Sequence, residues 1–237
     1  MNIHGLQKMT LLDFPGHVAC TVFLGSCDFR CPFCHNFELA CGNEKPVMTE
    51  DELITFLEGR TSLLDGVAFT GGEPCLHKDL PELIKKIRAM GYPVKLDTNG
   101  YHPEMVEMLI DEKLVDYIAM DIKNSGEKYA MTCGIPSVDM EKIGRSIDLI
   151  MNRAKDYEFR TTCVAELHEA EDFEKMGEMI KGAKKYFLQA FTDRESVPFG
   201  NLHAPSYEKM AEFAEISRKY ALNVELRGID KNTQDIE

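Results

Sequence analysis

The sequence predicts an α/β fold built on parallel strands. Two observations predict it: short apolar runs alternate with longer amphipathic stretches along the chain, and the chemically unusual residues follow directly after the apolar runs. Strand–helix alternation indicates parallel pairing with helical crossovers. The rhythm alone fits an open doubly wound sheet or a partial barrel, and both folds carry their sites at the carboxyl ends of the strands.

The predicted strands are short, apolar and bounded by turn residues. Chemically distinctive residues follow the first four of them, so we expect one edge of the sheet to carry the chemistry. The strands are predicted at 18–24, 66–70, 93–97, 117–121, 158–163, 186–191 and 222–227.

The predicted helices fill the intervals between these strands. Thr49 and Glu52 have the spacing of a capping box, and Gly91 and Gly182 stand where helices commonly end. The helices are predicted at 49–58, 78–90, 103–112, 139–154, 169–181 and 206–219.

The length of 237 residues suits one large domain. Because no linker-like stretch interrupts the chain, we predict a single domain over 1–237. It would have a short N-terminal extension at about 1–17 and a closing helix and strand at about 206–228.

The composition is that of a globular protein, with 44% hydrophobic and 28% charged residues. A net charge of −13 repels phosphates and anionic lipid, which predicts neither a nucleic-acid nor a membrane partner. The apolar runs are too short to span a bilayer, and the first ten residues lack the pattern of a signal peptide. We therefore expect a cytoplasmic protein with reduced cysteines.

Three of the eight cysteines form a C-x3-C-x2-C pattern, Cys27, Cys31 and Cys34. Zinc, with His35 or Cys41 completing the usual four ligands, is one interpretation. A disulfide or a set of buried thiols is another. A cubane iron–sulfur cluster is closed by four ligands, so three thiolates would leave one iron open for a substrate or cofactor.

Polar residues mark the ends of the next three strands. The second strand is followed by Gly71-Gly72-Glu73-Pro74, the third ends at Asp97 and the fourth at Asp121. Two carboxylates that converge at one edge need a cation or a shared proton, because like charges repel. The alternative is that each aspartate caps a loop or pairs with a lysine.

The cysteine pattern, with Phe33 before its third cysteine and Gly71-Gly72-Glu73-Pro74 after it, resembles the radical S-adenosylmethionine (SAM) superfamily. Other stretches resemble glycyl-radical-enzyme activating enzymes, and within them the activating proteins of anaerobic ribonucleoside-triphosphate reductase. The resemblance spans about 3–228 and implies a partial (β/α)6 barrel with the active site at the C-terminal strand ends. The stretches that carry the resemblance to these activating enzymes are 12–16, 34–36, 97–100, 120–123, 157–162, 187–189 and 224–228.

The resemblance implies roles for individual residues. Cys27, Cys31 and Cys34 would bind three irons of one [4Fe–4S] cluster, and SAM would chelate the fourth iron through its amino and carboxylate groups. Phe33 would contact the adenine, and Lys123 would pair with the SAM carboxylate. Gly71, Gly72 and Glu73 would hold the methionine ammonium.

A second group of residues is implied to complete the site. Asp97 and Asp121 would hold a monovalent cation beside SAM, and Thr98 belongs to the same cofactor-binding motif. Arg160, Gln189 and Phe191, at the ends of the last strands, would face the cavity.

The implied activity is reductive cleavage of SAM followed by removal of a hydrogen atom from a glycine Cα. The partner would be anaerobic (class III) ribonucleotide reductase, with flavodoxin or ferredoxin as the one-electron donor. Alternatives are activation of pyruvate formate-lyase or another glycyl radical enzyme, a small-molecule radical SAM enzyme, and a non-catalytic zinc or thiol-redox protein. Neither Cys75 nor the 192–205 loop has a predicted role.

Overall fold

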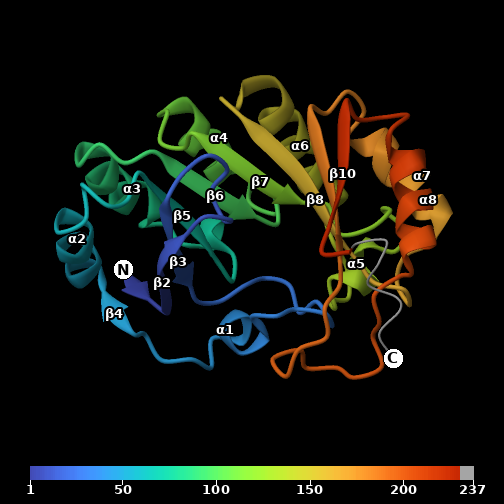
Figure 1. Cartoon of the computed structure of the whole chain (residues 1–237), viewed down its shortest axis with the longest axis horizontal. Helices are drawn as coiled ribbons and strands as arrows, with labels where there is room; N and C mark the ends of the chain where they lie inside the picture. The colour runs from blue at the N-terminus through green and yellow to red at the C-terminus, as the bar shows by residue number, and fades with distance from the viewer. Residues whose placement is uncertain (230–237) are drawn as a thin grey trace.

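The computed structural model describes residues 1–229, so the end of the predicted domain, 230–237, lies outside the described residues. Within the described part, one eight-stranded sheet has the order β10-β9-β8-β7-β6-β5-β3-β2 (Figure 1). The strands are β2 (Gly5–Thr10), β3 (Ala19–Leu24), β5 (Gly66–Gly71), β6 (Val94–Thr98), β7 (Tyr117–Asp121), β8 (Tyr157–Cys163), β9 (Lys185–Ala190) and β10 (Asn223–Arg227).

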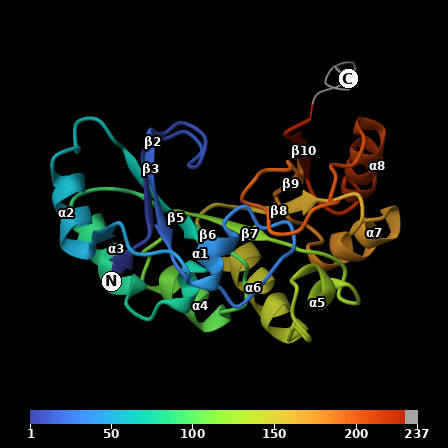
Figure 2. The same ribbon diagram turned by 90° about the horizontal axis from the view of Figure 1, so that it is seen from below.

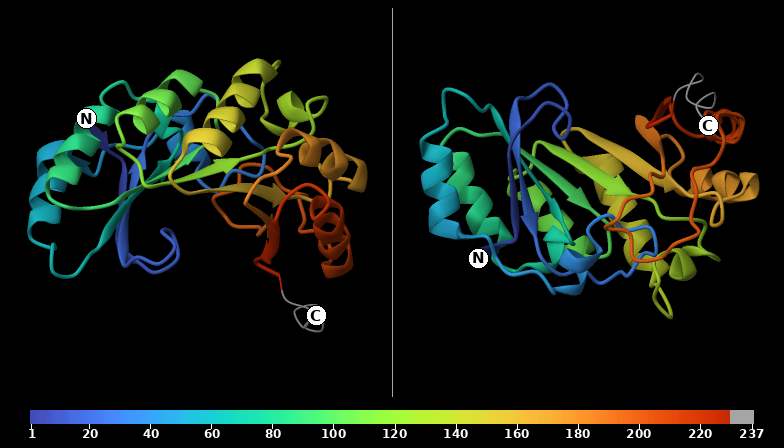
Figure 3. Two further views of the ribbon diagram at one scale, coloured as in Figure 1. Left: turned by 90° about the horizontal axis from the view of Figure 1, so that it is seen from above. Right: turned by 60° about the horizontal axis from the view of Figure 1, so that its bottom comes forward.

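The strand order decides between the two predicted architectures. From β3 to β10 the sheet strands are neighbours in the order of the chain, and every adjacent pair is parallel. A doubly wound sheet reverses its order at a switch point, and no reversal occurs among the described strands. Crossovers of one hand then place the helices on one face, and Figures 2 and 3 show the sheet curving with helices outside it. The fold is a partial barrel with edge strands β2 and β10.

The N-terminal segment, expected as an extension, contributes two strands. β2 pairs antiparallel with β3 at the edge of the sheet, and β1 (Asn2–Ile3) pairs antiparallel with β4 (Met48–Thr49). β2 has the sequence Gly-Leu-Gln-Lys-Met-Thr and is largely exposed. An edge strand of this kind has no apolar run, which is why the sequence pattern did not predict it.

The helices cover the convex face of the sheet. The predicted capping box is present at Thr49, whose side chain accepts a hydrogen bond from Glu52 N at 3.3 Å. Gly91 and Gly182 adopt the positive φ angles, 93° and 89°, that suit a chain leaving a helix. The longer helices are α2 (Glu50–Glu58), α3 (Leu80–Ala89), α4 (Pro103–Asp111), α6 (Met140–Arg153), α7 (Ala170–Met179) and α8 (Tyr207–Ser217), and the short ones α1 (Phe37–Cys41), η1 (Pro74–Leu76) and α5 (Tyr129–Thr132).

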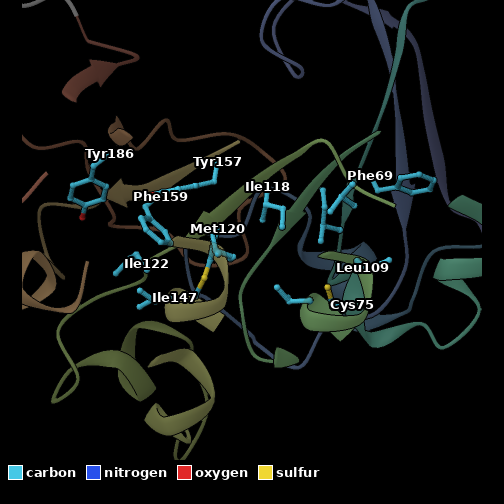
Figure 4. Close-up of a cluster of buried hydrophobic side chains, with 14 of the residues drawn as sticks. Phe69, Cys75, Leu109, Ile118, Met120, Ile122, Ile147, Tyr157, Phe159 and Tyr186 are labelled. Carbon is cyan, nitrogen blue, oxygen red and sulfur yellow. The ribbon is translucent and has the colours of Figure 1, made fainter. Parts of the chain in front are cut away.

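The main hydrophobic core lies between the sheet and these helices (Figure 4). Phe69, Ile118 and Phe159 come from three strands, and Ile147 comes from α6. Cys75 is only 3% exposed and belongs to the same core. No helix within residues 1–229 is long and apolar enough to cross a membrane.

Candidate active site

One pocket at the carboxyl ends of the strands collects most of the predicted site residues. Gln189 and Phe191 are the two predicted residues that are not among those lining it. The sequence did not assign roles to several others that do, among them Phe29, Asn36, Thr70, Asn99 and Thr162. The predicted residues in the lining are Cys27, Cys31, Phe33, Cys34, Gly71, Gly72, Glu73, Asp97, Thr98, Asp121, Lys123 and Arg160.

Phe191 and Gln189, which the resemblance implies would face the cavity, do not belong to the pocket lining. The Phe191 ring stacks on His35, with ring centroids 5.9 Å apart. Gln189 is in register with Thr162 on β8, so it shares the concave face with that residue without joining the pocket wall.

The three cysteines lie in a loop that α1 holds against the sheet. Cys27 N donates to Ala40 O at 3.0 Å, and Cys34 N donates to Cys31 O at 3.1 Å. The Cys27 sulfur accepts a weak hydrogen bond from Asn99 Nδ2 at 3.7 Å. All three thiols therefore face one pocket from a single, tightly folded loop.

This donor set suits a cluster better than a single ion. Within residues 1–229, no three His, Cys, Asp or Glu side chains converge closely enough to hold one metal ion. His35, a candidate zinc ligand, instead lies with its Nε2 2.7 Å from Thr192 O. Burial raises the pKa of Cys27 to about 12 and also raises that of Cys34, and a bound positive centre would reverse this effect. Three thiols sharing a pocket match the ligand requirement of an open iron–sulfur cluster.

The Gly-Gly-Glu loop packs directly on the cysteine loop. Gly72 N donates to Leu24 O and Glu73 N donates to Ser26 O, both at 2.8 Å. A Cβ on Gly72 would lie 1.9 Å from Ser26 O, and one on Gly71, whose φ is +112°, would lie 2.5 Å from Leu24 O. The two glycines are thus required because they let two backbone segments of the protein itself approach closely. This requirement holds whether or not a ligand also approaches them.

Glu73 links this loop to the end of β6. Its Oε1 accepts from Cys75 N at 2.9 Å and from Thr98 Oγ1 at 2.8 Å, and its Oε2 accepts from Asn99 N at 2.7 Å. Burial raises the pKa of Glu73, and these hydrogen bonds oppose that shift. Since Asn99 also reaches Cys27, Glu73 connects two strand ends with the cysteine loop.

Arg160 joins the two aspartates. Its Nε donates to Asp121 Oδ1 at 2.9 Å, and its NH1 donates to Asp97 Oδ2 at 3.2 Å. Lys95 pairs with Asp97 Oδ1, and Lys123 Nζ donates to Asp121 Oδ2 at 2.9 Å. Both aspartates therefore pair with cationic side chains, and each of them pairs with a lysine, which is the alternative that the sequence left open.

The ionisation of this cluster follows from its charges. Burial works against ionisation of Asp121, but the charges of Arg160 and Lys123 outweigh it and lower the pKa of Asp121 to about 2. The charges of Arg160 and Lys95 also lower the pKa of Asp97 against burial. Burial disfavours the Lys123 ammonium, yet the Asp121 carboxylate raises the pKa of Lys123. These shifts favour the charged forms of Asp97, Asp121 and Lys123 at neutral pH.

With this geometry established, comparison with known proteins identifies the family. The sequence profile described as the Radical SAM superfamily matches residues 21–180. The chain belongs to the radical SAM superfamily. It is 32% identical over 234 residues to a Methanocaldococcus jannaschii protein provisionally named a glycyl-radical enzyme activating enzyme, with 96% of each chain covered. It is also 33% identical over 130 residues to the pyruvate formate-lyase-activating enzyme of Clostridium pasteurianum, covering 52% of each chain.

Solved radical SAM structures share its fold. A domain of the pyruvate-formate lyase-activating enzyme from Bacteroides vulgatus superposes with a TM-score of 0.55 at 20% identity, covering 69% of this chain and 99% of that one. Streptococcus suis SuiB bound to its precursor peptide SuiA gives a TM-score of 0.64 at 13% identity, covering 88% of this chain and 48% of that one. The predicted partial barrel is confirmed, and the chain is a radical SAM enzyme related to glycyl-radical-enzyme activating enzymes.

Proposed function

We propose that this radical SAM enzyme installs a glycyl radical on a partner protein. The observation that carries the proposal is the single pocket in which three thiols meet the Gly-Gly-Glu loop and Lys123. The cluster and SAM, when bound, supply a 5′-deoxyadenosyl radical through one-electron cleavage of the sulfonium, and the target is a hydrogen atom on a glycine Cα.

Different residues of the pocket would bind different parts of the cluster and SAM. Cys27, Cys31 and Cys34 would hold the cluster, and Phe33, which is 5% exposed, offers an apolar wall for the adenine. The Gly71–Glu73 segment would receive the methionine ammonium. Lys123 would direct its ammonium to the SAM carboxylate while Asp121 keeps it charged. Thr98 would act from the end of β6, held by Glu73.

The partner we propose is anaerobic ribonucleotide reductase, with pyruvate formate-lyase or another glycyl radical enzyme as the second candidate. The matching stretches at 12–16 and 224–228 support the first, and the similarity to named pyruvate formate-lyase-activating enzymes supports the second. An external donor such as flavodoxin or ferredoxin would supply the electron. All eight thiols are free, which suits the reducing cytoplasm that we propose as its location.

The first test is anaerobic reconstitution with iron and sulfide, followed by reduction, addition of SAM and assay of 5′-deoxyadenosine. Electron paramagnetic resonance (EPR) spectra of the reduced protein, with and without SAM, report SAM binding at the cluster. Each of the variants Cys27→Ala, Cys31→Ala and Cys34→Ala should lose its bound iron and should form no 5′-deoxyadenosine. Cys41→Ala is the matched control, because Cys41 is a free thiol outside the pocket lining and should retain both.

The second test identifies the partner. The reduced enzyme is mixed with SAM and either purified anaerobic ribonucleotide reductase or purified pyruvate formate-lyase, and the glycyl radical is quantified by EPR. A radical on the reductase alone supports our first proposal, and a radical on the lyase alone replaces it with the second. Tightly bound zinc that iron does not displace would contradict the activity itself.

A further inference from the structure

The pair of aspartates at the ends of β6 and β7 has no carboxylate oxygen without a cationic partner. Asp97 Oδ1 pairs with Lys95 and its Oδ2 with Arg160 at 3.2 Å. Asp121 Oδ1 pairs with Arg160 at 2.9 Å and its Oδ2 with Lys123 at 2.9 Å. The guanidinium therefore stands between the two aspartates and contacts both.

These contacts do not fit the monovalent cation that the sequence resemblance implied. Three cationic side chains face two carboxylates, so the cluster already carries one positive charge in excess. A sodium or potassium ion would need oxygens that now accept from Arg160, and it would lie beside a like charge. Glu158 lies two residues before Arg160 on β8, and each of its carboxylate oxygens accepts a hydrogen bond of 3.0 Å from Arg227. Glu158 therefore offers no unpaired oxygen for a cation.

We propose that the Arg160 guanidinium takes the place of a metal cation in this site, so that SAM binding in this chain requires neither Na⁺ nor K⁺. The inference rests on the proposed function for the identity of the ligand. Arg160 acts here as a positioning residue: it holds Asp97 and Asp121 together and leaves the excess positive charge at the pocket wall. The anionic part of SAM, its carboxylate, is the group this charge would attract.

The backbone explains how one side chain spans both aspartates. Arg160 is in register with Asp121 on the neighbouring strand, so the two side chains leave the same face of the sheet side by side. Asp97 lies one strand further along, and a planar guanidinium can donate in two directions at once. The Arg160 side chain is 15% exposed, which limits competition from water.

The test measures SAM affinity by calorimetry on the reconstituted protein in three matched buffers of equal ionic strength. Tetramethylammonium, too large to enter between two carboxylates, is compared with Na⁺ and with K⁺. For the natural chain we expect the same dissociation constant in all three. For Arg160→Ala we expect at least about tenfold weaker binding in tetramethylammonium, because two partly buried carboxylates lose their shared partner. Na⁺ or K⁺ should restore it in a saturable way.

Thermal unfolding without SAM or iron gives a second readout that is independent of activity. A cation that binds only the folded state raises its melting temperature. We expect Na⁺ or K⁺ to raise that of Arg160→Ala and not that of the natural chain. Arg145→Ala is the matched control: Arg145 also bridges two carboxylates, Glu104 and Glu107, but on the exposed helical surface, so no cation dependence should appear.

Two results would overturn the inference. One is a saturable dependence on Na⁺ or K⁺ in the natural chain; the other is an Arg160→Ala variant that neither cation restores or stabilises. Arg160→Lys, which keeps the charge but not the fork, covers the case in which the alanine variant does not fold and should show partial dependence. If the natural chain binds no SAM in any buffer, the proposed function fails, and the unfolding comparison still decides the role of Arg160.

Discussion

Replacing Gly72 by Ala should separate the Gly-Gly-Glu loop from the cysteine loop. The added Cβ would lie 1.9 Å from Ser26 O and 2.6 Å from Ser26 C, and both are backbone atoms that cannot rotate away. Relief requires the two segments to part, which strains or breaks the hydrogen bonds Gly72 N–Leu24 O and Glu73 N–Ser26 O. Overpacking costs about 1–3 kcal/mol. Two weakened hydrogen bonds add about 1 kcal/mol each, so we expect a loss of about 3 kcal/mol or more.

The assay is urea unfolding of the iron-free protein, followed by measurement of iron retained per chain after reconstitution. Gly72→Ala should lower both quantities, because Cys27 follows Ser26 directly. Gly144→Ala is the matched control: its Cβ would meet nothing within 4 Å, and Ala is the better helix former within α6. Stability and iron content like those of the natural chain in Gly72→Ala would refute the packing argument.

Two further predictions concern buried charges away from the cysteines. Among residues 1–229, Arg227→Ala leaves the Glu158 carboxylate, which is 2% exposed, with the Tyr117 hydroxyl at 2.9 Å as its one side-chain hydrogen-bond partner. The variant should lose about 3 kcal/mol of stability in urea unfolding. A loss below about 1 kcal/mol would contradict this expectation, because an ordinary surface ion pair contributes that much. Burial opposes ionisation of Asp116, but hydrogen bonds from Lys155 and others outweigh it and lower its pKa below 3.8. The ionised Asp116 side chain therefore stabilises the folded state above about pH 4, and this stabilisation is lost as pH falls through the lowered pKa. The difference in unfolding free energy between the natural chain and Asp116→Asn should narrow below about pH 4. An unchanged difference would contradict this assignment.

The elements that sequence predicts well are those whose burial produces a long pattern. The central strands are buried on both faces or nearly so, and their apolar runs give boundaries within one or two residues of the observed ones. The pattern does not reveal β2, because an exposed edge strand needs few apolar residues. Nor does it reveal α1 or α5, each too short to show a helical period.

The features of the site likewise fall into those that the sequence predicts and those that it does not. Cysteine spacing and the Gly-Gly-Glu sequence are local, so the chain order shows them directly. The partner of Arg160 is not local: it depends on the register that sets Arg160 beside Asp121, and on Asp97 lying a further strand away. The same holds for Asn36, whose Nδ2 donates to Gly71 O at 3.1 Å, 35 residues along the chain. Spacing identifies which residues are available, and the sheet register determines which of them pair.

The alternation along β8 explains why the concave face of the barrel is polar enough to hold a zwitterion. Tyr157 and Phe159 point into the core below the helices, whereas Glu158 and Arg160 point to the opposite face. A strand buried in an ordinary parallel sheet is apolar on both sides. Here the inward carboxylates and cations are paired with one another, so the barrel avoids isolated buried charges. A ligand carrying both an ammonium and a carboxylate can then bind by exchanging partners within this network, so that the barrel's own charges are paired both before and after binding.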